Sequence, residues 1–218
     1  MSEVLEFWQE WFPTLLEGFG ISVKVTAVCL ALGIPLGLIL ALGVQAKSSV
    51  LRWTSLIVVE IGRGTPALIL LQFAYFGLPT AGLTLTSFTA ASLALAWSTG
   101  AYTSEIIRAG LDAVPFGQKE AAAAVGLTRI DALRYVILPQ GLRVALPALL
   151  GFSIIMLQAT SLCFTIALPE LVSQAYIVGS NTFRYLAIFV LAALVFGSVC
   201  IPATILVSAL ERRLGRHA

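Results

Sequence analysis

Residues 113–140 read AVPFGQKEAAAAVGLTRIDALRYVILPQ and form a polar island in a chain that is otherwise almost entirely apolar. Across all 218 residues, 59% are hydrophobic and only 11% are charged, whereas about a quarter of the residues in a typical soluble domain are charged. A composition this apolar indicates an integral membrane protein. The polar island must then lie outside the hydrocarbon of the bilayer.

The first half of the island has the pattern of a short helix with a defined end. Pro115 and Gly117 disfavour an earlier start, and residues 120–125 are rich in alanine, which favours helix. Gly126 is a typical helix stop, because glycine adopts the left-handed backbone conformation that ends many helices. The sequence therefore predicts a helix that stops at Gly126.

A second short helix is expected to follow immediately. Thr128 is a good N-cap, and Asp131 places a carboxylate three residues later, in the position of a capping box. Pro139 is expected to end this helix. We call the resulting segment, residues 112–140, the knuckle and expect it to be rigid.

The knuckle carries a family signature. The spacing of Glu120-Ala121-Ala122 and Gly126 ahead of Leu138-Pro139 resembles the EAA loop in the membrane subunits of ATP-binding-cassette importers. Other segments resemble, in the same order, the permeases for polar amino acids, the histidine, glutamine, arginine, glutamate and opine type. They are Arg63-Gly64-Thr65-Pro66, Gly100-Ala101-Tyr102, Glu105-Ile106-Ile107-Arg108, Gly117-Gln118, Ile137-Leu138-Pro139-Gln140, Thr160-Ser161-Leu162, Thr182-Phe183-Arg184 and Leu210-Glu211-Arg212-Arg213. The resemblance covers residues 15–213.

This resemblance implies the membrane subunit of an ATP-driven importer that passes a polar amino acid, or a similar solute, from an extracytoplasmic binding protein into the cytoplasm by alternating access. It also implies a second permease subunit, identical or homologous, and separate ATP-binding-cassette ATPase subunits that carry ATP and magnesium. The residues implied to couple to the ATPase are Gln118, Glu120, Ala121, Ala122, Gly126 and Leu127. Without the family pattern, Glu120 would be interpreted as a solvated charge favoured by the helix dipole.

The chain has no Gly-Lys dipeptide and so lacks the phosphate-binding loop of an ATPase. If ATP drives the protein, another chain must bind it. We therefore expect a transport subunit that is not itself an enzyme and that holds no cofactor.

Five apolar segments are candidates to cross hydrocarbon about 30 Å thick, which takes about 20 residues of helix. They are residues 25–44, 55–78, 87–109, 142–168 and 185–210. The second segment contains Glu60 and Arg63, so a kink or break is expected at Thr65-Pro66, with Thr65 as N-cap and Pro66 as first helical residue. The sequence predicts an all-α integral membrane protein with five transmembrane helices in a single domain, residues 1–218.

The distribution of basic residues predicts the orientation, because lysine and arginine next to membrane spans are held on the cytoplasmic side. The basic residues of one side are Lys47, Arg52, Arg63, Arg108, Lys119, Arg129, Arg134, Arg143, Arg212, Arg213 and Arg216. The other side has only Lys24 and Arg184. We expect the amino terminus outside and the carboxyl terminus in the cytoplasm, with the knuckle between spans three and four also cytoplasmic. The predicted location is the plasma (inner) membrane of a prokaryote, as a multi-pass protein in contact with lipid.

Four charged residues fall within or beside predicted spans, where charges are costly unless they are paired or face water. Glu105 and Arg108 are three residues apart on one helix face and could form an ion pair. For these two residues, and likewise for Glu60 with Arg63, a structural or gating role is favoured over contact with a solute. In the main alternative, an ion-coupled secondary transporter or channel, these four residues would form an intramembrane relay.

Polar side chains deep in spans three and four mark a candidate substrate pathway. They are Ser98, Thr99, Tyr102, Gln158, Thr160 and Ser161. Hydroxyl groups in a membrane helix often bond to their own backbone, but the Gln158 amide needs another partner. The resembling permeases usually have Lys-Asp-Thr-Ser where this chain has Gln158-Ala159-Thr160-Ser161, so two charges are missing. We expect one cavity between spans three and four.

Metal and nucleic-acid chemistry is not indicated. Cys29, Cys163 and Cys200 lie far apart along the chain, and His217 is the sole histidine. This pattern offers neither metal-ligand spacing nor a disulfide framework. We expect no metal site and no nucleic-acid partner.

Overall fold

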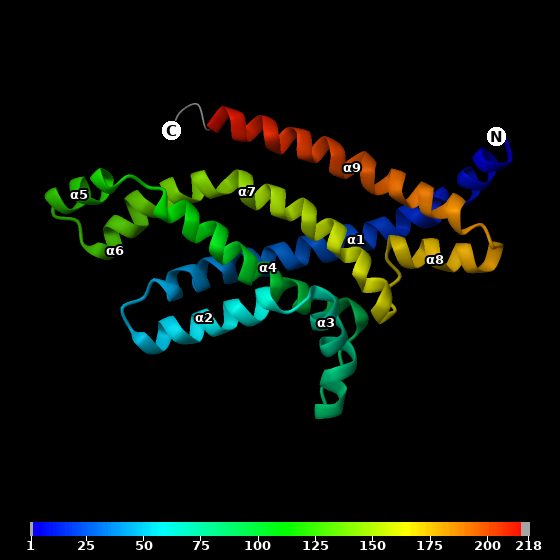
Figure 1. Cartoon of the computed structure of the whole chain (residues 1–218), viewed down its shortest axis with the longest axis horizontal. Helices are drawn as coiled ribbons and strands as arrows, with labels where there is room; N and C mark the ends of the chain where they lie inside the picture. The colour runs from blue at the N-terminus through cyan, green and yellow to red at the C-terminus, as the bar shows by residue number, and fades with distance from the viewer. Residues whose placement is uncertain (1, 215–218) are drawn as a thin grey trace.

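The computed structural model describes residues 2–214, and this part of the chain is helical without any strand (Figure 1). The predicted all-α fold is thus confirmed; Arg216 and His217 lie outside the described residues. The helices are α1 (Ser2–Val44), α2 (Ser49–Gly64), α3 (Ala67–Gln72), η1 (Phe73–Gly77), η2 (Leu78–Ala81), α4 (Ser87–Asp112), α5 (Phe116–Ala124), α6 (Arg129–Asp131), η3 (Ala132–Ile137), α7 (Leu138–Ala159), η4 (Thr160–Ile166), α8 (Leu171–Thr182) and α9 (Tyr185–Leu214).

Helix α1 is much longer than the span predicted at residues 25–44. Its 43 residues would extend about 65 Å at 1.5 Å per residue, roughly twice the hydrocarbon thickness. The additional amino-terminal half is held by tertiary contacts. Phe7 and Leu15 are buried against α8 and α9, and the Trp8 indole donates a 2.9 Å hydrogen bond to the carbonyl of Ala187. Apolar packing therefore extends the helix beyond the membrane span.

The second predicted span is broken where expected. Helix α2 and the helical segment Ala67–Ala81, which begins with α3, meet at an angle of 102°, with Thr65 and Pro66 both in extended backbone conformations. Proline disfavours a helical conformation in the residue before it, which explains Thr65. The break is one residue longer than predicted: Pro66 was expected to be the first helical residue, but it is the N-cap, and helix α3 begins at Ala67. The carbonyl of Pro66 accepts the first hydrogen bonds of this helix, from the amides of Ile69 and Leu70.

Helix α4 occupies the third predicted span but is enclosed by protein. It packs along α1 and α7, and fifteen of its 26 residues are buried. Small residues permit this close approach: a Cβ at Gly37 of α1 would overlap the Thr103 hydroxyl, and one at Gly110 would overlap the carbonyl of Gly141 in α7. A helix that faces protein on most sides needs little apolar surface for lipid, which explains its many serine, threonine and glycine residues.

The prediction that Pro139 ends a helix is wrong. The chain remains helical from α6 through η3 into α7. The reason is that η3 is a π-helical segment, and it ends at Ile137, two residues before the proline. The amide of Leu138 donates to the carbonyl of Leu133, five residues back. This wider turn accommodates the proline ring, which would otherwise clash with the carbonyl four residues earlier. Residues 129–166 thus form one long helical segment that contains the fourth predicted span except for its last two residues.

Helix α8 was not expected from the sequence, where residues 169–184 separate the last two predicted spans. Glu170 caps it by accepting hydrogen bonds from the amides of Val172 and Ser173. Figure 1 shows α8 and the amino terminus at one end of the molecule and α5 and α6 at the other. Of the described helices, those long and apolar enough to cross a membrane are Glu3–Val44, Arg129–Ile166 and Tyr185–Arg213, with the broken pair α2–α3 as a fourth candidate.

Candidate functional site

A cavity of about 500 Å³ lies beside the break between α2 and α3. We call it the break cavity. Its wall combines the broken backbone, the middle of α4 and the second half of α7. The lining residues are Arg63, Gly64, Thr65, Pro66, Ala67, Ser98, Tyr102, Phe152, Ile155, Met156 and Ala159. The break thus places backbone and one charged side chain beside an otherwise mostly apolar space.

Tyr102 joins the elements around this cavity. Its hydroxyl donates a 3.3 Å hydrogen bond to the carbonyl of Arg63 at the end of α2. Its ring stacks on Phe152 of α7, with 5.6 Å between the centroids, and the Arg63 guanidinium lies 5.9 Å from the Tyr102 centroid. One side chain of α4 therefore contacts both α2 and α7.

The predicted ion pair between Glu105 and Arg108 is present. The Arg108 Nε donates to Glu105 Oε1 at 3.3 Å, and a second guanidinium nitrogen of Arg108 contacts Oε2. The pair belongs to a larger group, since Arg63 lies 3.8 Å from Glu105 and Asp112 lies 3.6 Å from Arg108. These contacts extend from the break cavity to the end of α4, where α5 follows after three residues.

Glu60 does not join this group. Its side chain is exposed and forms no ion pair within residues 2–214. Arg63 instead contacts Glu105, because the end of α2 packs against α4. A structural or gating role for the four charged residues remains a prediction.

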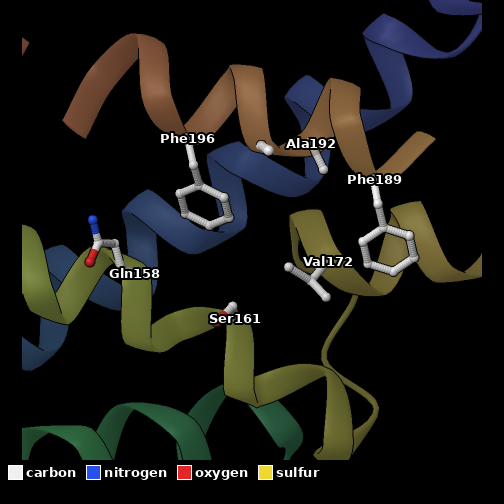
Figure 2. Close-up of a pocket in the computed structure, with 7 residues that line it drawn as sticks. Gln158, Ser161, Val172, Phe189, Ala192 and Phe196 are labelled. Atoms are coloured by element: carbon white, nitrogen blue, oxygen red, sulfur yellow. The ribbon is translucent and has the colours of Figure 1, made fainter. Parts of the chain in front are cut away.

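A second cavity, of about 300 Å³, lies on the other side of α7 (Figure 2). We call it the amide cavity after Gln158. Its other lining residues are Ser161, Val172, Phe189, Ala192, Ala193 and Phe196. Figure 2 shows the rings of Phe196 and Phe189 projecting from α9, Phe196 toward the segment that carries Gln158 and Ser161 and Phe189 beside Val172 of α8. Within the part of the chain that the structure describes, no charged side chain lines this cavity.

The structure does not bring the six predicted pathway residues into one cavity. Ser98 and Tyr102 line the break cavity, whereas Gln158 and Ser161 line the amide cavity. Successive residues of a helix point about 100° apart, so neighbours in sequence face different sides.

The remaining two pathway residues, Thr99 and Thr160, are fully buried in the core. Thr160 donates its hydroxyl to the carbonyl of Leu157 at 2.7 Å, which is the backbone pairing common for threonine in membrane helices.

The carboxyl end of α5 has the geometry predicted for the knuckle. Gly126 has a φ of 79°, its amide donates to the carbonyl of Ala123, and the amide of Leu127 donates to that of Ala122. This pair of bonds defines a Schellman motif, in which glycine takes the left-handed position at least cost. Thr128 then caps α6 by accepting from the amide of Asp131.

The surface of the knuckle differs in part from the expected one. Gln118, Glu120, Ala121, Gly126 and Leu127 are exposed, but Ala122 is buried against the chain itself and so supports the fold. Gln118 also accepts a 3.2 Å hydrogen bond from Gln140, which ties α5 to the start of α7.

Three exposed apolar side chains were missed in the sequence: Phe116, Val125 and Ile130, which are 71%, 75% and 76% exposed. The sequence could have indicated this surface, because large apolar residues are unexpected in a polar segment that lies outside the membrane.

Comparison of the sequence with known proteins identifies the family of this chain. Residues 33–216 match the model of the family described as "Binding-protein-dependent transport system inner membrane component". The chain is 36% identical to the L-cystine transport system permease protein TcyB of Bacillus subtilis (strain 168), over 96% of this chain and 90% of that protein. It is 34% identical to the arginine transport system permease protein ArtQ of the same organism, over 93% of both.

A solved structure described as an amino acid ABC transporter with histidines has the same fold. Its chain is 35% identical, covers 94% of this chain and superimposes with a TM-score of 0.88. The resemblance predicted from the knuckle and its neighbouring segments is therefore confirmed.

Proposed function

The chain belongs to the binding-protein-dependent transport system inner membrane components, and we propose that it is the membrane-spanning subunit of an ATP-driven importer for an amino acid or an amino-acid-like solute. The observation that carries this proposal is the combination of amino-acid permease relatives with the capped and exposed α5. The solute passes from an extracytoplasmic binding protein into the cytoplasm by alternating access.

In this proposal the chain crosses the membrane five times, with the amino terminus outside and the carboxyl terminus in the cytoplasm. Helix α4 provides the third crossing despite its polar composition, because its 26 residues extend about 39 Å and most of its surface faces protein. The basic residues near the end with α5 support a cytoplasmic position for that end.

In this proposal, conformational changes driven by ATP hydrolysis are transmitted to the permease through the knuckle. A separate ATPase subunit, which binds ATP and magnesium, docks on α5 and the turn at Gly126. The exposed Phe116, Val125 and Ile130 support docking, because apolar side chains outside the membrane are costly unless a partner covers them. Helix α4 runs from the break cavity to within three residues of α5 and provides a stiff connection between docking surface and pathway.

A second permease subunit, identical or homologous, completes the membrane unit, and the solute passes along the break cavity or the amide cavity. The alternative of an ion-coupled relay has less support. Glu60 is exposed and apart from the other three charges, and both oxygens of Glu105 are occupied by Arg108.

Reconstituted vesicles test the proposal. They contain this chain with its cognate ATPase, ATP inside, and the binding protein with radiolabelled amino acids outside. We expect ATP-dependent uptake and solute-stimulated hydrolysis, both lost in Glu120→Lys and Gly126→Asp although the membrane chain remains folded. Uptake that proceeds without ATP and stops when a proton or sodium gradient is removed would overturn the proposal and favour the gradient-driven transporter.

A further inference from the structure

We infer that the break cavity is a solute-binding site that holds the solute's carboxylate at Arg63 and selects amino acids with uncharged side chains. This inference rests on the proposed function and adds the chemistry of the site. The two cavities have different compositions, and among the described residues a charged side chain lines the break cavity but not the amide cavity.

The guanidinium of Arg63 has more N–H donors than its contacts with the described residues use. A guanidinium carries five N–H groups, yet among the described residues the one acidic contact of Arg63 is the 3.8 Å approach to Glu105. Both oxygens of Glu105 already accept from Arg108. The Nε of Arg63 is buried and has no hydrogen-bond partner within the described residues. The Arg63 side chain is 37% exposed, so its terminal N–H groups are open to a ligand although Nε is buried. A guanidinium with accessible terminal donors fits a carboxylate, which accepts two parallel hydrogen bonds from it.

The end of helix α2 complements this cation. Its last residues, Arg63 and Gly64, line the cavity, and the carbonyl end of a helix carries negative partial charge. A positive ammonium group is stabilised at such an end. The two charged groups of a free amino acid therefore both find a complement at the break, where helix α2 stops.

The remainder of the wall decides which side chain fits. Phe152, Ile155, Met156 and Ala159 of α7 provide an apolar surface, and the Tyr102 hydroxyl is already bonded to the Arg63 carbonyl. No carboxylate from residues 2–214 lines the cavity. A cationic side chain would lose its hydration without gaining a partner, which is costly, and an anionic one would compete for Arg63. An uncharged side chain incurs neither cost.

The amide cavity is less suitable for an amino acid. Its polar side chains are Gln158 and Ser161, both neutral, and the other five lining residues are apolar. A zwitterion would place two charges there without an opposite charge for either. The composition thus favours the break cavity as the binding site.

Binding measurements on the assembled complex, permease with ATPase in lipid nanodiscs and without ATP, test the inference. Each standard L-amino acid is added separately, and the midpoint of thermal unfolding reports binding, since a ligand that binds the native state stabilises it. We expect stabilisation by neutral amino acids and none by L-arginine, L-lysine or L-glutamate. Comparable stabilisation by any of these three charged amino acids would overturn the selectivity, and stabilisation by no amino acid would overturn the site.

Radiolabelled binding then tests Arg63 directly. For the best-binding amino acid, the version with a carboxamide in place of the carboxylate should bind wild type about tenfold or more weakly. In Arg63→Gln this preference should fall toward one, whereas Arg63→Lys retains part of it. Arg52→Gln, which removes an exposed arginine from the same helix, serves as the matched control and should keep the full preference.

Two results would count against the site. An unchanged preference in a folded Arg63→Gln complex would overturn the role of Arg63, and loss of binding only in Gln158→Ala would move the site to the amide cavity. ATP-driven uptake of a cationic amino acid would contradict the proposed selectivity for uncharged side chains but leave the proposed importer function intact. The absence of any ATP-driven uptake would instead reject the proposed function.

Discussion

The hydroxyl of Tyr102 donates a hydrogen bond to the carbonyl oxygen of Arg63 across 3.3 Å, so helix α4 holds the broken end of helix α2. The carbonyl at the end of a helix has no partner within that helix and needs one elsewhere. Tyr102 supplies it while its ring packs on Phe152. This relationship stabilises the wall of the break cavity.

Tyr102→Phe removes this hydrogen bond and keeps the ring. We expect a loss of about 0.5–1.5 kcal/mol in the free energy of unfolding, the net value of one such bond. Thermal or denaturant unfolding in detergent measures it. Tyr135→Phe is the control, because the Tyr135 side chain is 63% exposed and should tolerate the change. Equal losses in both variants would show that the bond to Arg63 contributes nothing specific.

Gly126→Ala should weaken coupling, and Gly117→Ala should not. A new Cβ meets no atom within 4 Å at either position, so crowding is equal. Only Gly126 has a left-handed backbone, which costs a residue with a side chain about 1–2 kcal/mol. Hydrolysis of ATP stimulated by solute, measured in vesicles with the ATPase, should fall in Gly126→Ala. Equal effects of the two variants would contradict a role for the Schellman turn.

Ala121→Leu and Ala122→Leu should fail in different ways. Ala121 is exposed, so leucine there should leave the permease stable but reduce the amount of ATPase that co-purifies with it. Ala122 is 4% exposed, so leucine there should overpack the fold and cost about 1–3 kcal/mol of stability. Co-purification and thermal unfolding together separate the two effects. Retention of the ATPase by Ala121→Leu would argue against docking on this face.

The features predicted correctly from the sequence depend on chemistry within a few residues. Gly126 stops a helix because of its own backbone freedom, and Thr128 caps the next one through its own hydroxyl. Pro66 breaks the second span by restricting the residue before it. Each prediction required only local sequence, and each position was correct to within one residue.

Two of the features that were missed depend on contacts between distant segments, and the third, at Pro139, depends on the local backbone. Helix α8 and the first half of α1 stabilise each other, so neither resembles an independent apolar span. Gln158 and Ser98 lie in different cavities because α7 and α4 face several neighbours at once. Pro139 stayed within a helix because a π-helical turn precedes it.

Glu170 should make stability depend on pH. It lies between the last two predicted spans, fully buried, where Ser22 of α1 also donates to it at 3.5 Å. Burial raises the pKa of the Glu170 carboxyl from 4.5 to about 7, although the hydrogen bonds from Val172 and Ser173 oppose this shift. The folded state therefore holds a proton more tightly than the unfolded state. Its stability should be greatest below pH 4.5 and should decrease as the pH rises to about 7.

Thermal unfolding of the detergent-solubilised protein across this pH range measures the effect. Glu170→Gln should remove the decrease, because an amide does not titrate, at the cost of one hydrogen bond to the α8 amides. Glu17→Gln, which neutralises an exposed carboxylate on α1, should retain the wild-type profile. If wild type and Glu170→Gln lose stability equally between pH 4.5 and about 7, the titrating group lies elsewhere and Glu170 stays ionised in the folded protein, held by the two backbone amides.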